Sequence, residues 1–135
     1  MKLDYEYIKK ILTIMENYPK HEIESHEFWK LMGLTQDGKT YDDEILDKFI
    51  GHMKLIADDY LIESSLENFG IGFNRGNLFT STAHYRITSR GYEFLDVLKN
   101  DTAFNKIKKF ALSNALEIGK KVLVEVSSKM IAGGI

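Results

Sequence analysis

Apolar residues recur at helical spacing along the first part of the chain. A first helix is predicted after Asp4, whose side chain suits an N-cap. It should end before Pro19, because the residue that precedes a proline disfavours the helical conformation. A short second helix is predicted from Ser25, as its N-cap, to Gly33, which supplies a left-handed stop. The apolar stripe of the first helix consists of Tyr7, Ile8, Ile11, Leu12 and Met15.

A third helix is predicted from a capping box, formed by Thr40 and Asp43, to about Asp59. One broad face is apolar and the other is largely charged, which is typical of a helix that packs on a core with one side. The apolar face carries Ile45, Leu46, Phe49, Ile50, Met53, Ile56 and Ala57. The opposite face carries Glu44, Asp47, Lys48, Gly51, Lys54, Leu55 and Asp58.

After the third helix, apolar residues recur at every second position, which is the spacing of a strand. Residues 61–67 are predicted to form a strand, and residues 68–77 a glycine-rich turn region. Residues 79–87 alternate apolar and polar side chains, as in a strand with one buried face. Tyr85 and Ile87 are expected to face the core.

A fourth helix should follow this strand directly, capped by Thr88 or Ser89. Gly91 would permit close packing where the strand passes into the helix. Residues 100–102, Asn-Asp-Thr, break this helix and cap a fifth, long helix that is predicted to reach about Met130.

The order of these elements predicts the fold class. Three helices, a two-stranded hairpin and a further helix are the winged-helix arrangement, so we expect a mainly α protein with a small β-hairpin, in the α+β class. Residues 1–100 would form the winged helix-turn-helix domain. Residues 101–135 would add a long C-terminal amphipathic helix used for packing or dimerisation.

Three segments carry a family resemblance: "MKLDYEYIKKIL", "FIGHMKLIADDYLIE" and "YRITSRGYEFLDVLKNDTAFNKIK". With them the chain resembles a family of uncharacterised proteins from bacterial genomes and prophages, known only as a domain of unknown function. The last segment is also similar to the YjcQ-like winged-helix proteins. The resemblance implies a winged-helix core and an origin in or near mobile elements, and it implies no activity. The chain has Asp59-Tyr60 where winged helices commonly end the third helix with glycine.

Composition narrows the possible environments and chemistries. The chain has no cysteine, which excludes disulfides and thiol catalysis and fits a cytoplasmic protein. No apolar run approaches the roughly 20 residues that span a bilayer, so no membrane partner is expected. The net charge is −2. Residues 102–135 contain six lysines and two glutamates, a charge of +4, which leaves −6 for residues 1–101.

Signals for an enzyme are weak, and we predict neither catalysis, nor a metal, nor a cofactor. The four histidines lie in different predicted elements, and the closest two are five residues apart, which suits no chelate on a helix or strand face. The "GIGFNRG" loop precedes a strand instead of a helix, so it lacks the context of a phosphate or dinucleotide site. The histidines are His21, His26, His52 and His84.

Winged helices most often bind double-stranded DNA, with a helix in the major groove. Here the third helix begins with "YDDE", and these acids match the helix dipole but would repel phosphate. They also fit a simple solvated face. The candidate nucleic-acid-binding residues are Lys39, Lys48, Lys54, Arg75, Arg86 and Arg90, assisted by tail lysines if a dimer presents them together.

Two apolar segments are candidates for protein interfaces. In the glycine-rich region, aromatic and aliphatic residues occupy every second position. They form an exposed patch unless the side chains on one face of the strand pack into the core. The tail helix is too apolar to stand alone in water, so it packs either on its own core or on a second copy, and we favour a homodimer. The candidate interface residues are Phe69, Ile71, Phe73, Leu112, Leu116, Val122, Leu123 and Val126.

The sequence thus predicts a dimeric, cytoplasmic winged-helix regulator, a DNA-binding transcriptional regulator of phage or prophage type. The alternative hypothesis is a winged-helix protein–protein interaction module without DNA binding. It rests on the acidic third helix and the apolar wing. The fold-level analogy supplies much of the first hypothesis.

Overall fold

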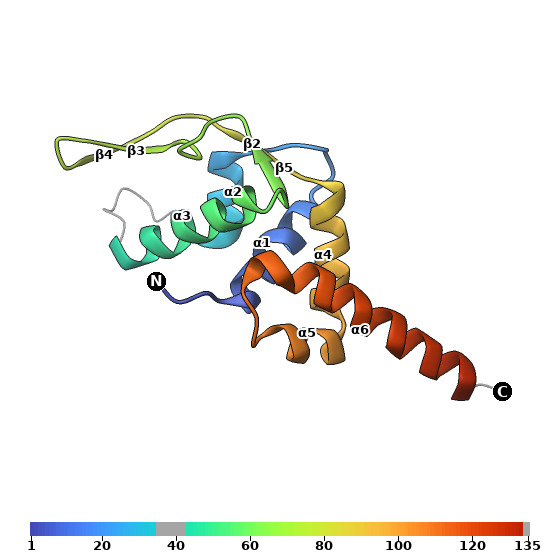
Figure 1. Ribbon diagram of the computed structural model, residues 1–135. Helices are drawn as coiled ribbons and strands as arrows, with labels where there is room; N and C mark the ends of the chain where they lie inside the picture. The colour runs from blue at the N-terminus through green and yellow to red at the C-terminus, as the bar shows by residue number, and fades with distance from the viewer. Residues whose placement is uncertain (35–42, 134–135) are drawn as a thin grey trace.

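The computed structural model describes residues 1–34 and 43–133, with side chains up to residue 128 (Figure 1). The predicted class, mainly α with a small antiparallel β part, is confirmed. The helices are α1 (Tyr5–Asn17), α2 (Ser25–Met32), α3 (Asp43–Asp58), α4 (Ser89–Lys99), α5 (Asp101–Ile107) and α6 (Leu112–Gly133). The strands are β1 (Ile23–Glu24), β2 (Ile62–Ser64), β3 (Ile71–Asn74), β4 (Asn77–Thr80) and β5 (His84–Ile87).

The strands form two small antiparallel sheets. In the first, β5 lies between β1 and β2, with Ile23 opposite Tyr85 and Ile62 opposite Ile87. The second consists of β3 and β4 alone and is inserted between β2 and β5. Three helices with a three-stranded sheet of this order and an inserted hairpin are the winged-helix arrangement. We refer to β3 and β4 with their turn, residues 71–80, as the wing.

The wing corrects the prediction for residues 68–77, which form more than a turn region. The β3–β4 connection has only two residues, Arg75 with φ 52° and Gly76 with φ 80°. Positive φ at both positions makes this a type I′ turn, which matches the twist of a two-stranded ribbon. The alternating segment 79–87 is likewise two strands, because residues 81–83 separate β4 from β5.

Local capping chemistry was predicted well, with one exception. Asp4 accepts from the backbone N–H of Tyr7, Asn100 accepts from that of Ala103, and Gly33 ends α2 in the left-handed conformation. Ser25 is not a cap: it is the first helical residue and is fully buried. Its hydroxyl accepts from the backbone N–H of Ala83 at 3.0 Å instead, and so ties α2 to β5.

An aromatic cluster holds α2, α3 and β5 together. The ring of Phe28 meets Tyr85 edge-on at 5.4 Å and Phe49 at 6.0 Å between ring centres, and all three are fully buried. The indole N–H of Trp29 donates to the hydroxyl of Tyr85, which in turn donates to the carbonyl of Phe69. This chain links the core to the base of the wing. Burial raises the pKa of Tyr85.

The surface of α3 differs from its predicted wheel in one respect. Ile45 was placed on the apolar face but is about half exposed, whereas Leu46, Phe49 and Met53 are buried as expected. The predicted capping box at Thr40 lies outside the described residues. The helix ends at Asp58, and Tyr60 takes the left-handed conformation, φ 60°, that glycine commonly supplies in this fold.

Thr88 stabilises this junction, so Thr88→Ala should lower the free energy of unfolding by about 1–2 kcal/mol. Its hydroxyl accepts from the backbone N–H of Gly91 at 3.0 Å, which caps α4. It also donates to the carbonyl of Tyr60 at 2.6 Å, which holds the left-handed residue. Urea denaturation measures the change. Thr88→Ser keeps both bonds and should cost less than half as much; equal losses in the two variants would contradict this role.

The predicted single long tail helix is wrong, because the chain turns at residues 108–111 and forms α5 and α6. Figure 1 shows α5 and the first part of α6 folded against α4 and α1, while the C-terminal part of α6 extends beyond the rest of the fold. The turn allows Phe104 and Ile107 of α5 and Leu112 and Leu116 of α6 to enter one core, and all four are buried.

Candidate interaction surfaces

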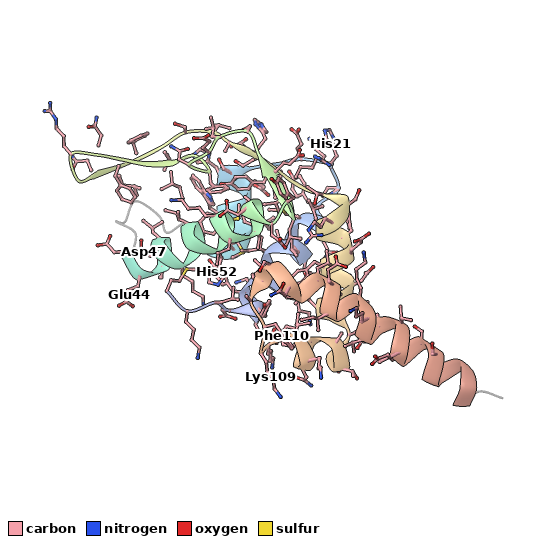
Figure 2. All side chains as sticks on the ribbon, in the orientation of Figure 1. His21, Glu44, Asp47, His52, Lys109 and Phe110 are labelled. Carbon is pink, nitrogen blue, oxygen red and sulfur yellow. The ribbon has the colours of Figure 1, made fainter. Side chains whose placement is uncertain are left out.

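The exposed face of α3 is acidic in its N-terminal half. Figure 2 shows Glu44 and Asp47 directed away from the body of the molecule. Asp43 is also exposed. Carboxylates at a helix N-terminus are stabilised by the helix dipole, and they repel the phosphates that a recognition helix must approach. This half of α3 is therefore a poor surface for DNA.

Three of the six predicted DNA-binding cations are ion-paired. Lys48 binds Asp4 at 2.9 Å, and its ammonium group also lies 4.7 Å from the centre of the Tyr7 ring. Arg86 binds Glu63 at 2.7 Å, across the β2–β5 pair. Exposed pairs of this kind contribute little to stability, but each carboxylate cancels the charge that a phosphate would meet.

Arg90 has a structural position rather than a free charge. Its Nε donates to the carbonyl of Asp59 at 3.0 Å, and its other nitrogens lie 3.4 Å from the Asp59 carboxylate and 3.8 Å from that of Glu117. It thereby joins the end of α3 to α4 and α6. Within the described residues, Lys54 and Arg75 are exposed and form no ion pair. Lys39 lies outside the described residues. The structure thus does not assemble the predicted cations into one positive strip.

Some apolar residues in and just before the wing are buried, and others are exposed. Phe69 and Ile71, both predicted interface residues, are buried, so they belong to the core of this chain. Phe73 is 56% exposed and Phe79 is 46% exposed. Strand register places Phe73 opposite Leu78 on the face toward α3, and Phe79 opposite Gly72 on the other face. The ring of Phe79 lies across Gly72, where a Cβ would overlap it.

The inner face of the wing packs on the helical core. Ile71, Leu78 and Thr80 line a small apolar hollow together with Trp29 of α2 and Leu46 of α3. The base of the wing is therefore anchored, while its tip, residues 73–79, reaches past the core (Figure 1). This arrangement presents two phenylalanines on a supported hairpin.

His52 is a buried histidine whose role the sequence did not indicate. The backbone N–H of Asp4 donates to its Nε2 at 3.0 Å, and its Nδ1 lies 2.7 Å from the carbonyl oxygen of Lys48. Because Nε2 accepts, the neutral ring carries its proton on Nδ1 and donates to that carbonyl. The Tyr7 ring lies 4.9 Å away. His52 therefore fastens the N-terminal segment to α3, and Figure 2 shows it beneath that helix.

Burial, hydrogen bonds and nearby charges shift the pKa values of His52 and its neighbours. Burial would raise the pKa of Asp4, but hydrogen bonds from Lys48 and from the Tyr7 backbone outweigh it and hold this pKa below 3.8. Burial and the Asp4 charge raise the pKa of Tyr7 to about 12. Burial also lowers the pKa of His52 below 6.5, although the Lys48 carbonyl and Asp4 oppose this. The ring is thus neutral at neutral pH.

Stability should fall as the pH drops below about 6.5. The unfolded chain binds a proton on His52 at higher pH than the folded protein does. The stabilisation is therefore complete above pH 6.5 and is lost as the pH falls towards the lowered pKa of the folded state. One proton gives a slope of at most about 1.4 kcal/mol per pH unit. Urea denaturation at a series of pH values measures this slope.

The exposed histidines provide the control for this pH dependence. A variant with His21→Gln, His26→Gln and His84→Gln, three residues at the protein surface, should keep the same slope between pH 6.5 and the folded pKa of His52. His52→Gln should lose it. A slope that disappears with the three exposed histidines would contradict the assignment to His52.

One family model matches residues 2–117, and its description is "Hypothetical protein (DUF2513)". The chain belongs to the DUF2513 family. No curated protein and no solved structure matches the chain. The match covers the winged helix, α5 and the first residues of α6. The expected membership in an uncharacterised domain family is thereby confirmed.

The tail helix of this DUF2513 protein has a buried and a projecting part. Leu112 and Leu116, predicted as interface residues, are buried in the chain's own core, which removes them from any surface. Val122 and Leu123 are half-buried against that core, and Val126 is half-buried as well. Val124 is 66% exposed. The DUF2513 match ends at residue 117, so these valines and Leu123 follow the matched segment.

Among the described residues of this DUF2513 chain, no group of three or more histidine, aspartate or glutamate side chains lies close enough to hold a metal ion. None of the described helices combines the length and the apolar character that crossing a bilayer requires. A groove of about 800 Å³ lies between the N-terminal segment, α3 and α5, and its walls mix carboxylates with Lys2, Lys48 and Lys108.

Proposed function

We propose that this protein is a winged-helix interaction module that docks a partner protein on its wing. The observation that carries the proposal is the pair of exposed phenylalanines, Phe73 and Phe79, on a hairpin whose base is fixed in the core. Aromatic side chains on a preorganised hairpin supply contact area at low entropic cost. A partner that buries both rings would gain most of its binding free energy from these two residues.

Charge narrows the kind of partner. The N-terminal half of α3, with Asp43, Glu44 and Asp47, lies at the same end of the molecule as the wing tip (Figures 1 and 2). A partner segment with apolar side chains for the wing and flanking lysines or arginines for α3 complements this end. A phosphate backbone would meet the carboxylates first. These two features favour protein over DNA as the ligand.

The binding test compares two double variants. Phe73→Ser with Phe79→Ser should weaken the interaction by at least about tenfold, because both anchors are lost. The control, Leu31→Ser with Tyr92→Ser, removes apolar side chains of similar exposure, 47% and 46%, from other surfaces and should change affinity less than twofold. Partners are first captured from a bacterial lysate, purified, and then titrated against both variants. Equal affinities for the two variants would contradict docking on the wing.

We also propose that two copies associate through α6 into a homodimer. Leu112, Leu116, Gly119, Leu123 and Val126 recur at alternating spacings of four and three, the seam pattern of paired helices. The first of these residues pack on the chain's own core, and the same stripe continues into the projecting part. A second α6 would cover it. The homodimer carries two wings, which gives a divalent module in the cytoplasm.

Light scattering after size exclusion should give twice the 15.6 kDa of one chain. Leu123→Glu with Val126→Glu places charges in the seam and should yield monomers, with the winged helix still folded by circular dichroism. Lys121→Glu changes an exposed position on the same helix and should remain dimeric. A wild-type mass of one chain at about 100 µM would contradict the homodimer.

A DNA-binding transcriptional regulator of phage or prophage type is the second candidate. Arg75 favours it, since this residue stands at the turn of the wing without a carboxylate partner among the described residues. The resemblance to YjcQ-like proteins implies a winged-helix core, and winged helices most often bind DNA. In a low-salt titration with random duplex DNA, Arg75→Gln with Lys54→Gln should then weaken binding by at least about tenfold. No complex with wild-type protein at high micromolar concentration would exclude this candidate.

A further inference from the structure

The turn between α5 and α6 carries exposed lysines that have no carboxylate partner. Lys106, Lys108 and Lys109 are exposed, and the ion pairs of the described residues include none of them. Other cations, such as Lys48, Lys99 and Lys120, each bind a carboxylate within 3 Å. We call Lys106, Lys108, Lys109 and Phe110 the α5–α6 corner. Figure 2 shows Lys109 and Phe110 at the lower edge of the molecule, away from the wing.

The backbone of the α5–α6 corner is firmly held. The hydroxyl of Tyr5 donates to the carbonyl of Phe110 at 2.7 Å, and the N–H of Phe110 donates to the carbonyl of Ile107 at 2.9 Å. Ile107 and Phe104 are buried beneath it. Burial also raises the pKa of Tyr5 to about 12, so this hydroxyl remains a donor at neutral pH. The lysines therefore extend from a backbone that hydrogen bonds and buried side chains hold in place.

A lysine from another helix joins this surface. The ammonium group of Lys108 lies 4.7 Å from the centre of the Phe104 ring, and that of Lys9 in α1 lies 5.9 Å from the same centre. Two cations thus converge on one aromatic ring. Phe110, two residues after Lys108, is 38% exposed. The corner combines clustered positive charge with an accessible aromatic face.

Helix stabilisation explains only part of this cluster. Lys106 occupies the last turn of α5, where a cation is favourable for the helix dipole. Lys109 follows the helix end, and Lys9 comes from α1, so neither has that role in α5. Four carboxylates, those of Asp4, Glu6, Glu44 and Asp47, line the same groove as Lys108 and Phe104, and Asp4 is paired there with Lys48. Lys106 and Lys109 do not line this groove, so the positive part of the corner is the side that carries these two lysines.

We propose that the α5–α6 corner binds single-stranded nucleic acid. Its lysines would contact consecutive phosphates, and one unpaired base would stack on Phe110, the combination that sequence-independent single-strand binders use. An anionic membrane fits less well, because Phe110 is the one exposed large apolar side chain of the corner and membrane-bound surfaces insert several. A duplex offers phosphates but keeps its bases stacked. The site is separate from the wing, and the groove that Lys108 lines connects it to the N-terminal half of α3.

The test is fluorescence anisotropy with a labelled 20-nucleotide single strand at low salt. A corner variant with Lys106→Gln, Lys108→Gln and Lys109→Gln should bind at least tenfold more weakly. Its slope of log affinity against log salt should fall by about 2. A charge-matched control carries Lys20→Gln, Lys30→Gln and Lys121→Gln, three exposed lysines elsewhere. It should change affinity less than twofold.

Phe110→Ala reports on stacking rather than charge. It should weaken single-strand binding about tenfold and leave weak duplex binding unchanged. Because all of these side chains are exposed or partly exposed, circular dichroism melting should confirm that each variant folds. The Phe73→Ser, Phe79→Ser variant should bind the oligonucleotide like wild type, so loss of the proposed wing function and loss of this one are separable.

Three outcomes would overturn the proposal. Wild-type protein that shows no binding at about 100 µM has no such site. Equal losses in the corner variant and its charge-matched control would mean that net charge alone attracts the oligonucleotide. Binding to vesicles that contain anionic lipid, without binding to the oligonucleotide, would assign the corner to a membrane surface instead.

Discussion

Phe28→Ala should lower the free energy of unfolding by about 3–5 kcal/mol, a large part of the roughly 5–15 kcal/mol that stabilises a typical domain. Phe28 is fully buried where α2, α3 and β5 meet. Its removal exposes the facing surfaces of Phe49 and Tyr85 to a cavity and ends the edge-on contact with Tyr85. Urea denaturation followed by circular dichroism measures the loss.

Two controls separate this cavity effect from a general effect on α2. Phe28→Leu keeps most of the volume and should cost about half as much. Leu31→Ala, on the exposed side of the same helix, should change the free energy of unfolding by less than about 0.5 kcal/mol. A Phe28→Ala variant as stable as wild type would contradict the packing of α2 against α3 and β5.

Gly91→Ala should destabilise the protein by about 3 kcal/mol. Its conformation is an ordinary helical one, so the limit is space. An added Cβ would overlap the backbone carbonyl oxygen of Leu61 and lie 2.7 Å from Cγ1 of Ile87. The Leu61 carbonyl already accepts from the N–H of Thr88 at 3.0 Å, which fixes it in place. Relief would require α4 to move away from the sheet, and overpacking of this kind is costly.

The control for Gly91→Ala is Ser89→Ala in the same first turn of α4. Ser89 is exposed, and its replacement should change the melting temperature by less than about 2 °C. Thermal melts of the two variants give the comparison directly. Equal melting temperatures for Gly91→Ala and Ser89→Ala would contradict the close packing of α4 against the Leu61 carbonyl.

The sequence predicted those features that depend on neighbouring residues. Asp4, Thr88 and Asn100 cap helices because an N-cap needs only a side-chain oxygen and the next N–H groups. Ser25 looks the same locally, but its hydroxyl bonds Ala83, 58 residues away, and no local rule indicates that. The turn between α5 and α6 has neither glycine nor proline, so an uninterrupted helix was the natural prediction.

The candidate surfaces were harder to predict because ion pairs are set by tertiary contacts. Lys48 meets Asp4 across 44 residues, and Arg86 meets Glu63 across 23. The sequence alone does not show that these two side chains are paired with carboxylates. His52 is also hidden in the sequence, since only the fold brings the Asp4 N–H to its ring. In the wing, the alternating pattern suggested that every second side chain would be buried. Ile71 and Phe73 point to the same face, yet only Ile71 is buried, because Phe73 lies farther from the helical core.

Two different surfaces of this small fold suit two different partners. The wing and the acidic half of α3 suit a protein partner with apolar and basic side chains. The α5–α6 corner suits a polyanion. This division follows the uneven charge of the chain, −6 over residues 1–101 and +4 over residues 102–135.

Site-specific photo-crosslinking tests the central claim most directly. A photoreactive phenylalanine analogue replaces Phe73 at the wing tip in one variant and Lys54 on α3 in another. After irradiation in bacterial cells, position 73 should give adducts that protease removes and nuclease does not, and Leu31→Ser with Tyr92→Ser should leave them in place. Nuclease-sensitive adducts at position 54, with none containing protein at position 73, would contradict the account.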